Sequence, residues 1–237
     1  MPTEATVTLE ELSCRTLKDF ETSVEPYIWP VLIKIDSSTI NAADGRRVDV
    51  IAPSDANSLV RIKSGMKAGT SAPIPGSLGT LSARFSNSTS NQQLIVLVQL
   101  MERDETPGHA MHKGYRAYVK ELRAAFKAEF IHLFEAENDD AELALVVGRI
   151  KKRVEGKVTS VIEDSLSVGE KIKANFQDQD DAIGSAFARF KGDPIKSAPI
   201  LLKYDHAEAV AIGNNPFNKI DTFVSYRIRG RLRMREV

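Results

Sequence analysis

The sequence has little cysteine and no long apolar run. Its 237 residues include one cysteine, Cys14. A single thiol excludes an internal disulfide framework and a zinc–thiolate cluster, and the burial tendency of free cysteine predicts a small core residue on the first strand. No stretch approaches the roughly 20 apolar residues that a membrane-spanning helix needs.

The chain also lacks a charge excess, and its first residues are not expected to be a Sec-type leader. Lys and Arg together number 32, as do Asp and Glu, so any attraction to nucleic acid or to an anionic membrane has to come from local patches. The first residues, MPTEATVTLEEL, have neither the basic n-region nor the apolar h-region of a Sec-type signal peptide. We therefore expect no nucleic-acid partner and a protein that is cytoplasmic or peripheral to a membrane, with export by another route left open.

Common catalytic motifs are missing as well. The chain has no P-loop, no G-x-S-x-G and no H-E-x-x-H. Its Ser, His and Asp residues have no spacing that places them as a triad, so we expect a protein that is not an enzyme. A weaker alternative is a zinc or other transition-metal site, because His109 and His112 lie three residues apart near Glu102, Asp104 and Glu105.

What the sequence does contain is a series of short β-patterned segments separated by turn residues. This spacing is typical of an all-β sandwich. The expected strands cover residues 5–12, 25–36, 47–51, 59–62, 80–85, 94–101, 183–190, 200–204 and 226–235. Pro26 and Pro30 favour a sheet edge or a bulge for the second of them.

The last expected strand has the clearest alternation. One face carries Tyr226, Ile228, Leu232 and Met234, and the other carries Arg227, Arg229, Arg231, Arg233 and Arg235. Gly230 indicates a bulge or a close contact. The arginines are interpreted as a solvated outer face that discourages pairing with another chain, with an anionic-headgroup site as the alternative.

The apolar period lengthens after His109, which predicts two amphipathic helices. The first apolar stripe is Tyr115, Val119, Leu122, Phe126, Phe130, Leu133 and Phe134, and the second is Leu143, Val146, Val147, Ile150, Val154, Val158, Val161 and Ile162. Residues 138–140, NDD, separate them and offer an N-cap. We expect a helical hairpin at 109–176 inserted into a sandwich of 1–108 and 177–237, with the stripes packed on each other or open to a membrane or partner.

Acidic residues cluster where the expected strands end. Asp19 stands near Glu25, Glu102 stands near Asp104, and residues 178–181 read DQDD. Loops at one end of a sandwich bring distant residues together, and carboxylates gathered without a cation repel each other. Calcium takes six to eight oxygen ligands, so these clusters predict a bound cation.

Three motifs resemble a known family. Asp19, followed after five residues by EPY at 25–27, resembles the first calcium loop of the C2 family, the lipid-binding domains of protein kinase C and synaptotagmin, with Glu in place of the family's second Asp. ERD at 102–104 resembles the start of the third calcium loop, and DAIG at 181–184 resembles its close. In ordinary C2 members these two parts are a few residues apart, whereas here a long insert separates them.

The resemblance implies a mainly β protein, an antiparallel eight-stranded Greek-key β-sandwich with an α-helical hairpin inserted in the third acidic loop. It implies calcium as the cofactor and an anionic phospholipid or membrane surface as the partner. The metal ligands that it implies are Asp19, Glu25, Glu102, Asp104 and Asp181, with Asp180 as a substitute for Asp181. Phe20 would add an apolar contact at the membrane interface.

Two other functions stay open at this point. One is a non-enzymatic protein–protein interaction or structural module, which displays the inserted helices or the arginine face to a protein partner. The other is a membrane-damaging protein whose helical hairpin inserts into the bilayer after docking.

Overall fold

The computed structural model describes residues 2–18, 24–36, 48–85, 92–103, 106–129, 140–167, 182–192, 194–211 and 219–237. The fold is mainly β, with two antiparallel sheets and a few helices. The first sheet has the strand order β4-β1-β9-β8, and β5 also pairs with β1. Its strands are β1 (Thr3–Lys18), β4 (Ser71–Pro73), β5 (Thr80–Phe85), β8 (Ala198–Ala211) and β9 (Lys219–Glu236).

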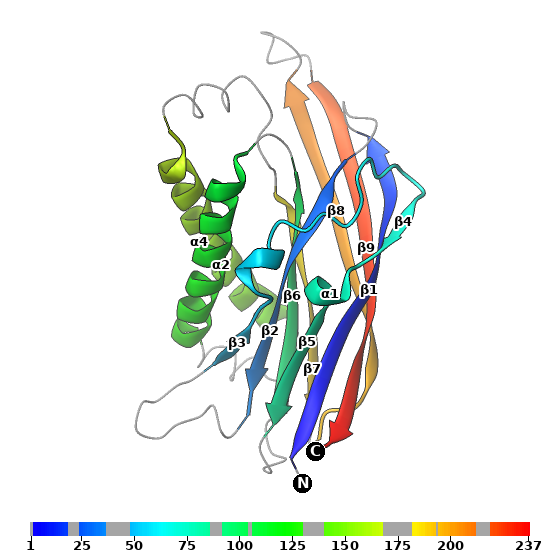
Figure 1. Ribbon diagram of the computed structural model, residues 1–237, viewed down its shortest axis with the longest axis vertical. Helices are drawn as coiled ribbons and strands as arrows, with labels where there is room; N and C mark the ends of the chain where they lie inside the picture. The colour runs from blue at the N-terminus through cyan, green and yellow to red at the C-terminus, as the bar shows by residue number, and fades with distance from the viewer. Residues whose placement is uncertain are drawn as a thin grey trace.

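The second sheet has the order β3-β2-β6-β7. Its strands are β2 (Pro26–Ile35), β3 (Asp49–Ile51), β6 (Gln92–Glu102) and β7 (Ala182–Gly192). The described helices are η1 (Asp55–Asn57), α1 (Gly76–Gly79), α2 (Gly108–Ala128) and α4 (Asp140–Ser165). As Figure 1 shows, α2 and α4 cover the face of the second sheet that points away from β1 and β9. The layers are therefore sheet, sheet and helices.

The second sheet is apolar on both faces because both faces are covered. On β2, Ile28 and Leu32 belong to the core between the two sheets, whereas Trp29, Val31 and Ile33 belong to a second core under the helices. β6 alternates in the same way. Side chains on successive strand residues point to opposite faces, so a nearly continuous apolar strand has to be buried on both sides.

The helices occupy the positions that the apolar period predicts. Both lie between β6 and β7 in the chain, and α4 begins at Asp140, the last residue of the expected break. The stripe residues in the core under the helices pack on each other and also on the second sheet, whereas Phe130, Leu133, Phe134 and the Leu143 side chain lie outside the described residues. A Cβ at Gly114 would lie 2.7 Å from a carbon of Ile162, so this glycine allows α2 and α4 to approach closely. None of the described helices is long and apolar enough to cross a membrane.

The two prolines of β2 lie where the strand has one partner. β6 pairs with all of β2, whereas β3 pairs only with Leu32, Ile33 and Lys34. Pro30 therefore lies in a half of the strand that has no second ladder among the described strands, as the expected edge position requires.

Three expectations for the strands need correction or refinement. Residues 59–62 form no strand, because this segment instead wraps the open half of β2, with the Ile62 N–H donating to the Pro26 carbonyl at 3.0 Å. The connection between the strands expected at 59–62 and 80–85 contains β4 and α1. The part of the chain that the structure describes has nine strands rather than eight.

The close contact expected at Gly230 is confirmed. A Cβ there would lie 2.3 Å from the Thr8 carbonyl oxygen on β1. The register of β1 against β9 shifts between Leu9 and Glu11, directly opposite this glycine. The bulge and the missing side chain together let the two longest strands stay paired.

Candidate functional site

The strand ends next to the predicted calcium ligands lie at one end of the fold. β1 ends at Lys18, β2 begins at Pro26, β6 ends at Glu102 and β7 begins at Ala182. The antiparallel pairing of β2 with β6 and of β6 with β7 puts the ends of these three strands side by side, and β1 ends at the same end of the fold in the other sheet (Figure 1). Asp19, Asp104 and Asp181, and also Asp180 and Phe20, lie outside the described residues, so the shared ligand set stays a prediction.

Glu25 is held by neighbours of its own. Its Oε2 accepts a hydrogen bond from Arg61 Nη1 at 2.6 Å, and its Oε1 accepts one from Ser64 Oγ at 2.6 Å. Val24, one residue earlier, is buried in the core between the sheets, so Glu25 points to the opposite side of the strand. The carboxylate is thus neutralised by an arginine on the helix-facing side.

Glu102 points into the other side of the same sheet. Burial raises the pKa of the Cys14 thiol, a hydrogen bond with Tyr226 lowers it, and the negative charge of Glu102 raises it further. Leu100, two residues earlier on β6, belongs to the core between the sheets, so Glu102 lies on the same face of the strand. Glu25 and Glu102 therefore lie on opposite faces of the second sheet. Within the described ranges, no group of three or more His, Cys, Asp or Glu side chains is arranged to hold a metal ion.

The two histidines of α2 contact different elements. His112 Nδ1 lies 2.9 Å from Ser58 Oγ, and His109 Nε2 lies 3.2 Å from the Ser165 carbonyl oxygen. Ser58 follows η1 and Ser165 ends α4, so the imidazoles do not converge on one point. This geometry favours a role for both in fixing the N-terminal end of α2 over a shared zinc site.

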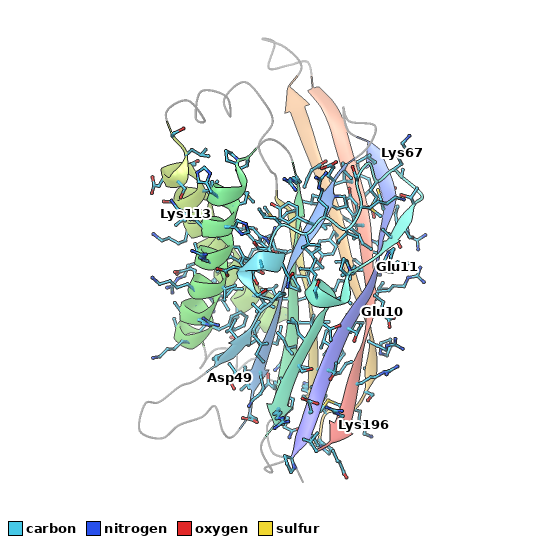
Figure 2. The ribbon with its side chains drawn as sticks, viewed as in Figure 1. Glu10, Glu11, Asp49, Lys67, Lys113 and Lys196 are labelled. Atoms are coloured by element: carbon cyan, nitrogen blue, oxygen red, sulfur yellow. The ribbon has the colours of Figure 1, made fainter. Side chains whose placement is uncertain are left out.

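The arginine face of β9 is a ladder of ion pairs. The partners lie on the neighbouring strands: Arg227 pairs with Asp205 at 3.0 Å, Arg229 with Glu11 at 2.7 Å, Arg231 with Glu10, and Arg235 with Glu4. Figure 2 shows Glu10 and Glu11 projecting from β1 on the side away from α2 and α4. The acids largely neutralise the arginines, which favours the solvated-face interpretation over a headgroup site.

Asp205 shows how these pairs act on the carboxylates. Hydrogen bonds from Ser225 and Arg227 hold the pKa of Asp205 below its usual range. The side chain is half exposed, so the pair is screened by water and contributes little to stability. The arginine face of β9 therefore remains solvated, and its ion pairs align β9 with the neighbouring strands.

A pocket of about 670 Å³ lies between α4, α2 and the helix-facing side of the second sheet. Its sheet wall is formed by Trp29 on β2, by Leu97 and Met101 on β6, and by Phe187 on β7. α2 contributes a second apolar wall with Tyr118, Leu122 and Phe126, and α4 closes the remaining side. Sites for small molecules in proteins have volumes of roughly 300–1,000 Å³ and mainly apolar walls.

Trp29 and Tyr118 make the floor of the pocket rigid. The Trp29 indole N–H donates to the Ser58 carbonyl at 2.9 Å, and its ring lies 5.4 Å from the ring of Tyr118. Both side chains are almost fully buried. Burial raises the pKa of the Tyr118 hydroxyl far above its usual range, so this wall stays uncharged.

Two polar side chains interrupt the apolar sheet wall. Gln99 on β6 and Ser185 on β7 are paired across the strands and both line the pocket. Gln99 is 5% exposed, and its amide makes a single long hydrogen bond, 3.4 Å to the Leu100 carbonyl, among the described residues. The buried Ser185 Oγ has no hydrogen-bond partner within the same part of the chain.

In the described part of the chain, the charged residues that line the pocket all come from α4. They are Lys151, Glu155 and Glu163. Lys151 Nζ lies 3.5 Å from Glu155 Oε1, and both side chains are more than two-fifths exposed. The charges therefore lie at the solvent side, whereas the sheet wall carries none.

The pocket was not expected from the sequence, although two signals point to it. Gln99 is the single polar residue in the run from Leu94 to Met101. Trp29 is the only tryptophan of the chain. It lies on a strand that is apolar on both faces except at Lys34. Each signal alone is also typical of ordinary core packing, and only the pairing of β6 with β7 brings Gln99 to Ser185.

No family model matches this chain, and no curated protein is significantly similar to it.

Proposed function

We propose that the protein is a non-catalytic binding module that holds a small, mainly apolar molecule between its helical hairpin and the second sheet. The observation that carries this proposal is the pocket of about 670 Å³ with aromatic and aliphatic walls. Filling such a space with an apolar ligand removes apolar surface from water at roughly 25 cal/mol per Å². Protein interiors normally contain few voids larger than a water molecule. The pocket is therefore much larger than an ordinary packing defect.

The only tryptophan of the chain lies in the pocket wall and provides the test. We expect the apolar dye N-phenyl-1-naphthylamine to bind the purified protein with about one equivalent at saturation and to quench Trp29 by energy transfer. In Trp29→Phe the dye should still bind, as seen from its own emission, but the transfer should vanish. Dye binding without quenching of Trp29 in the wild-type protein would place the dye elsewhere and contradict the proposal.

A second candidate function is calcium-dependent docking on anionic phospholipid membranes, by a C2-like Greek-key sandwich. What supports it is the gathering of the ends of β1, β2, β6 and β7 at one end of the fold. Because Glu25 already accepts bonds from Arg61 and Ser64, the proposed ligands are Asp19, Glu102, Asp104 and Asp181. Calcium there would neutralise the acidic end and bridge to a lipid phosphate.

A thermal melt with and without calcium tests this second candidate. Calcium at a hundred times its dissociation constant should add about 2.7 kcal/mol of stability, and Asp104→Asn should abolish the gain. Co-sedimentation with phosphatidylserine vesicles should then require calcium and fail with a chelator. Dye leakage from the same vesicles would favour the membrane-damaging alternative, and an unchanged melt would refute the calcium site.

A further inference from the structure

We infer that the pocket selects a ligand with one uncharged hydrogen-bonding group, such as the hydroxyl of a long-chain alcohol, on an otherwise apolar body. This inference rests on the proposed binding function and adds the chemical class of the ligand. The observation behind it is the pair formed by Gln99 and Ser185, which are the polar residues of the pocket wall on β6 and β7.

Both members of the pair have unused hydrogen-bonding capacity. The Ser185 hydroxyl is buried without a partner in the described part of the chain, and an unsatisfied buried group of this kind costs about 1–3 kcal/mol. The Gln99 amide has two donors and an acceptor, of which one long bond to the Leu100 carbonyl is used among the described residues. A ligand hydroxyl can both donate and accept, so it matches an amide beside a serine hydroxyl.

The charges around the pocket select against an anionic head group. Among the described lining residues, the sheet wall near Gln99 has no cation, and the charges on α4 are one lysine against two glutamates. Arg189, two residues beyond Phe187 on β7, is held by Gln93 at 2.8 Å. A carboxylate at the pair would be buried without an opposite charge, and such burial costs far more than burial of a neutral hydroxyl.

The size of the pocket limits the rest of the ligand. A single medium-length alkyl chain or a small fused-ring body fits the 670 Å³ between the aromatic floor and α4. Among the described residues of β2 and α2 that line the pocket, the polar groups are the Trp29 indole N–H and the Tyr118 hydroxyl, which already donate to the carbonyls of Ser58 and Trp29. The body of the ligand is therefore apolar along its length.

Displacement of N-phenyl-1-naphthylamine, followed by recovery of Trp29 emission, tests the selection. At pH 8, 1-decanol should displace the dye at a concentration at least tenfold lower than decanoate. Ser185→Ala and Gln99→Leu should each reduce this ratio several-fold, because each removes one partner of the ligand hydroxyl. The dye dissociation constant is measured separately for each variant and the ratio is calculated from it, so that a change in dye affinity does not enter the comparison; far-UV circular dichroism shows that each variant is folded.

The outcomes separate this inference from the function on which it rests. If the dye binds but decanoate displaces it as well as decanol, or if Ser185→Ala leaves the ratio unchanged, the inference is wrong and the binding function stands. If the dye does not bind at all, both fail. Ser185→Ala should also unfold at an equal or higher urea concentration than wild type, since it removes an unsatisfied hydroxyl. A clearly lower midpoint would show that the hydroxyl serves the fold.

Discussion

Two glycines of α4 allow the pocket to be filled without disturbing the fold. Gly148 lines the pocket, and a Cβ built on it meets no atom within 4 Å. Gly156, eight residues further along the same helix, is also exposed and equally open, but it is not among the lining residues. Gly148→Phe therefore places a ring where the ligand is proposed to lie, and Gly156→Phe places the same ring on the same helix outside the pocket.

Both substitutions should stabilise the protein. Glycine in a helix interior costs about 0.8–1.0 kcal/mol relative to alanine, and phenylalanine costs roughly half as much, so each variant should gain about 0.5 kcal/mol. At position 148 the phenyl ring is also transferred from water to the apolar wall of the pocket. Full burial of such a side chain yields about 1.5–3 kcal/mol, and partial burial should add about 1 kcal/mol to the gain. Urea titrations followed by far-UV circular dichroism measure both values.

The binding assay then gives the decisive comparison. In Gly148→Phe, the dissociation constant of N-phenyl-1-naphthylamine should rise at least tenfold, a loss of about 1.4 kcal/mol. In Gly156→Phe it should stay within twofold of wild type. Equal dye affinity in all three proteins would refute the reasoning, because a ligand between α4 and the sheet cannot share its space with the new ring. Equal weakening in both variants would point to a general effect on α4 and count against the pocket as well.

Two further predictions concern the frame that holds the site. Gly230→Ala should lower the free energy of unfolding by about 2 kcal/mol or more, since its Cβ meets the Thr8 carbonyl oxygen at 2.3 Å and backbone cannot rotate away; a urea midpoint equal to wild type would contradict the close approach. Lys34→Met should cost about 3–5 kcal/mol, because the lysine Nζ, 8% exposed, lies 3.4 Å from the fully buried carboxylate of Asp36. Calorimetry checks the second value, and a cost below about 1 kcal/mol would show that other groups compensate this carboxylate.

The layout of strands and helices could be predicted largely from the sequence, because periodicity follows from burial. The alternation of β9 fixed its buried face, with Tyr226, Ile228 and Leu232 in the core as expected. The start of α4 at Asp140 falls in the break that residues 138–140 predict. These are short-range signals, and they do not depend on which elements meet in space.

The helix layer on the second sheet was harder to predict, although one signal was present. A sandwich strand with one solvated face alternates apolar and polar residues, whereas β2 and β6 are apolar at nearly every position. That pattern requires a cover on both faces, and the two amphipathic helices were the available cover. The apolar stripes of the two helices are instead expected to pack on each other, because a helical hairpin can bury its own apolar faces.

The candidate site depends on register, which the sequence does not encode in any short segment. Gln99 and Ser185 are far apart in the chain, and a shift of one residue between β6 and β7 would turn one of them to the opposite face. The predicted calcium ligands also show that position in the sequence does not determine the face of the sheet on which a side chain lies. Glu25 and Glu102 flank neighbouring strand ends, yet they lie on opposite faces of the sheet, with Glu102 on the same face of β6 as Leu100.

The pocket and the acidic end border each other, which makes the two proposed functions testable together. Met101, Thr106 and Ile183 line the pocket, and each lies within two residues of a predicted calcium ligand, Glu102, Asp104 or Asp181. A cation that fixes those backbones would also fix this side of the pocket, so calcium and the apolar ligand should bind with a coupling free energy of about 1–3 kcal/mol. The dissociation constant of the dye should then change at least fivefold on addition of calcium. By linkage, a saturating dye must change the calcium affinity by the same factor. If the dye binds equally with calcium and with a chelator, while calcium still raises the melting temperature, the two sites act independently and this coupling is wrong.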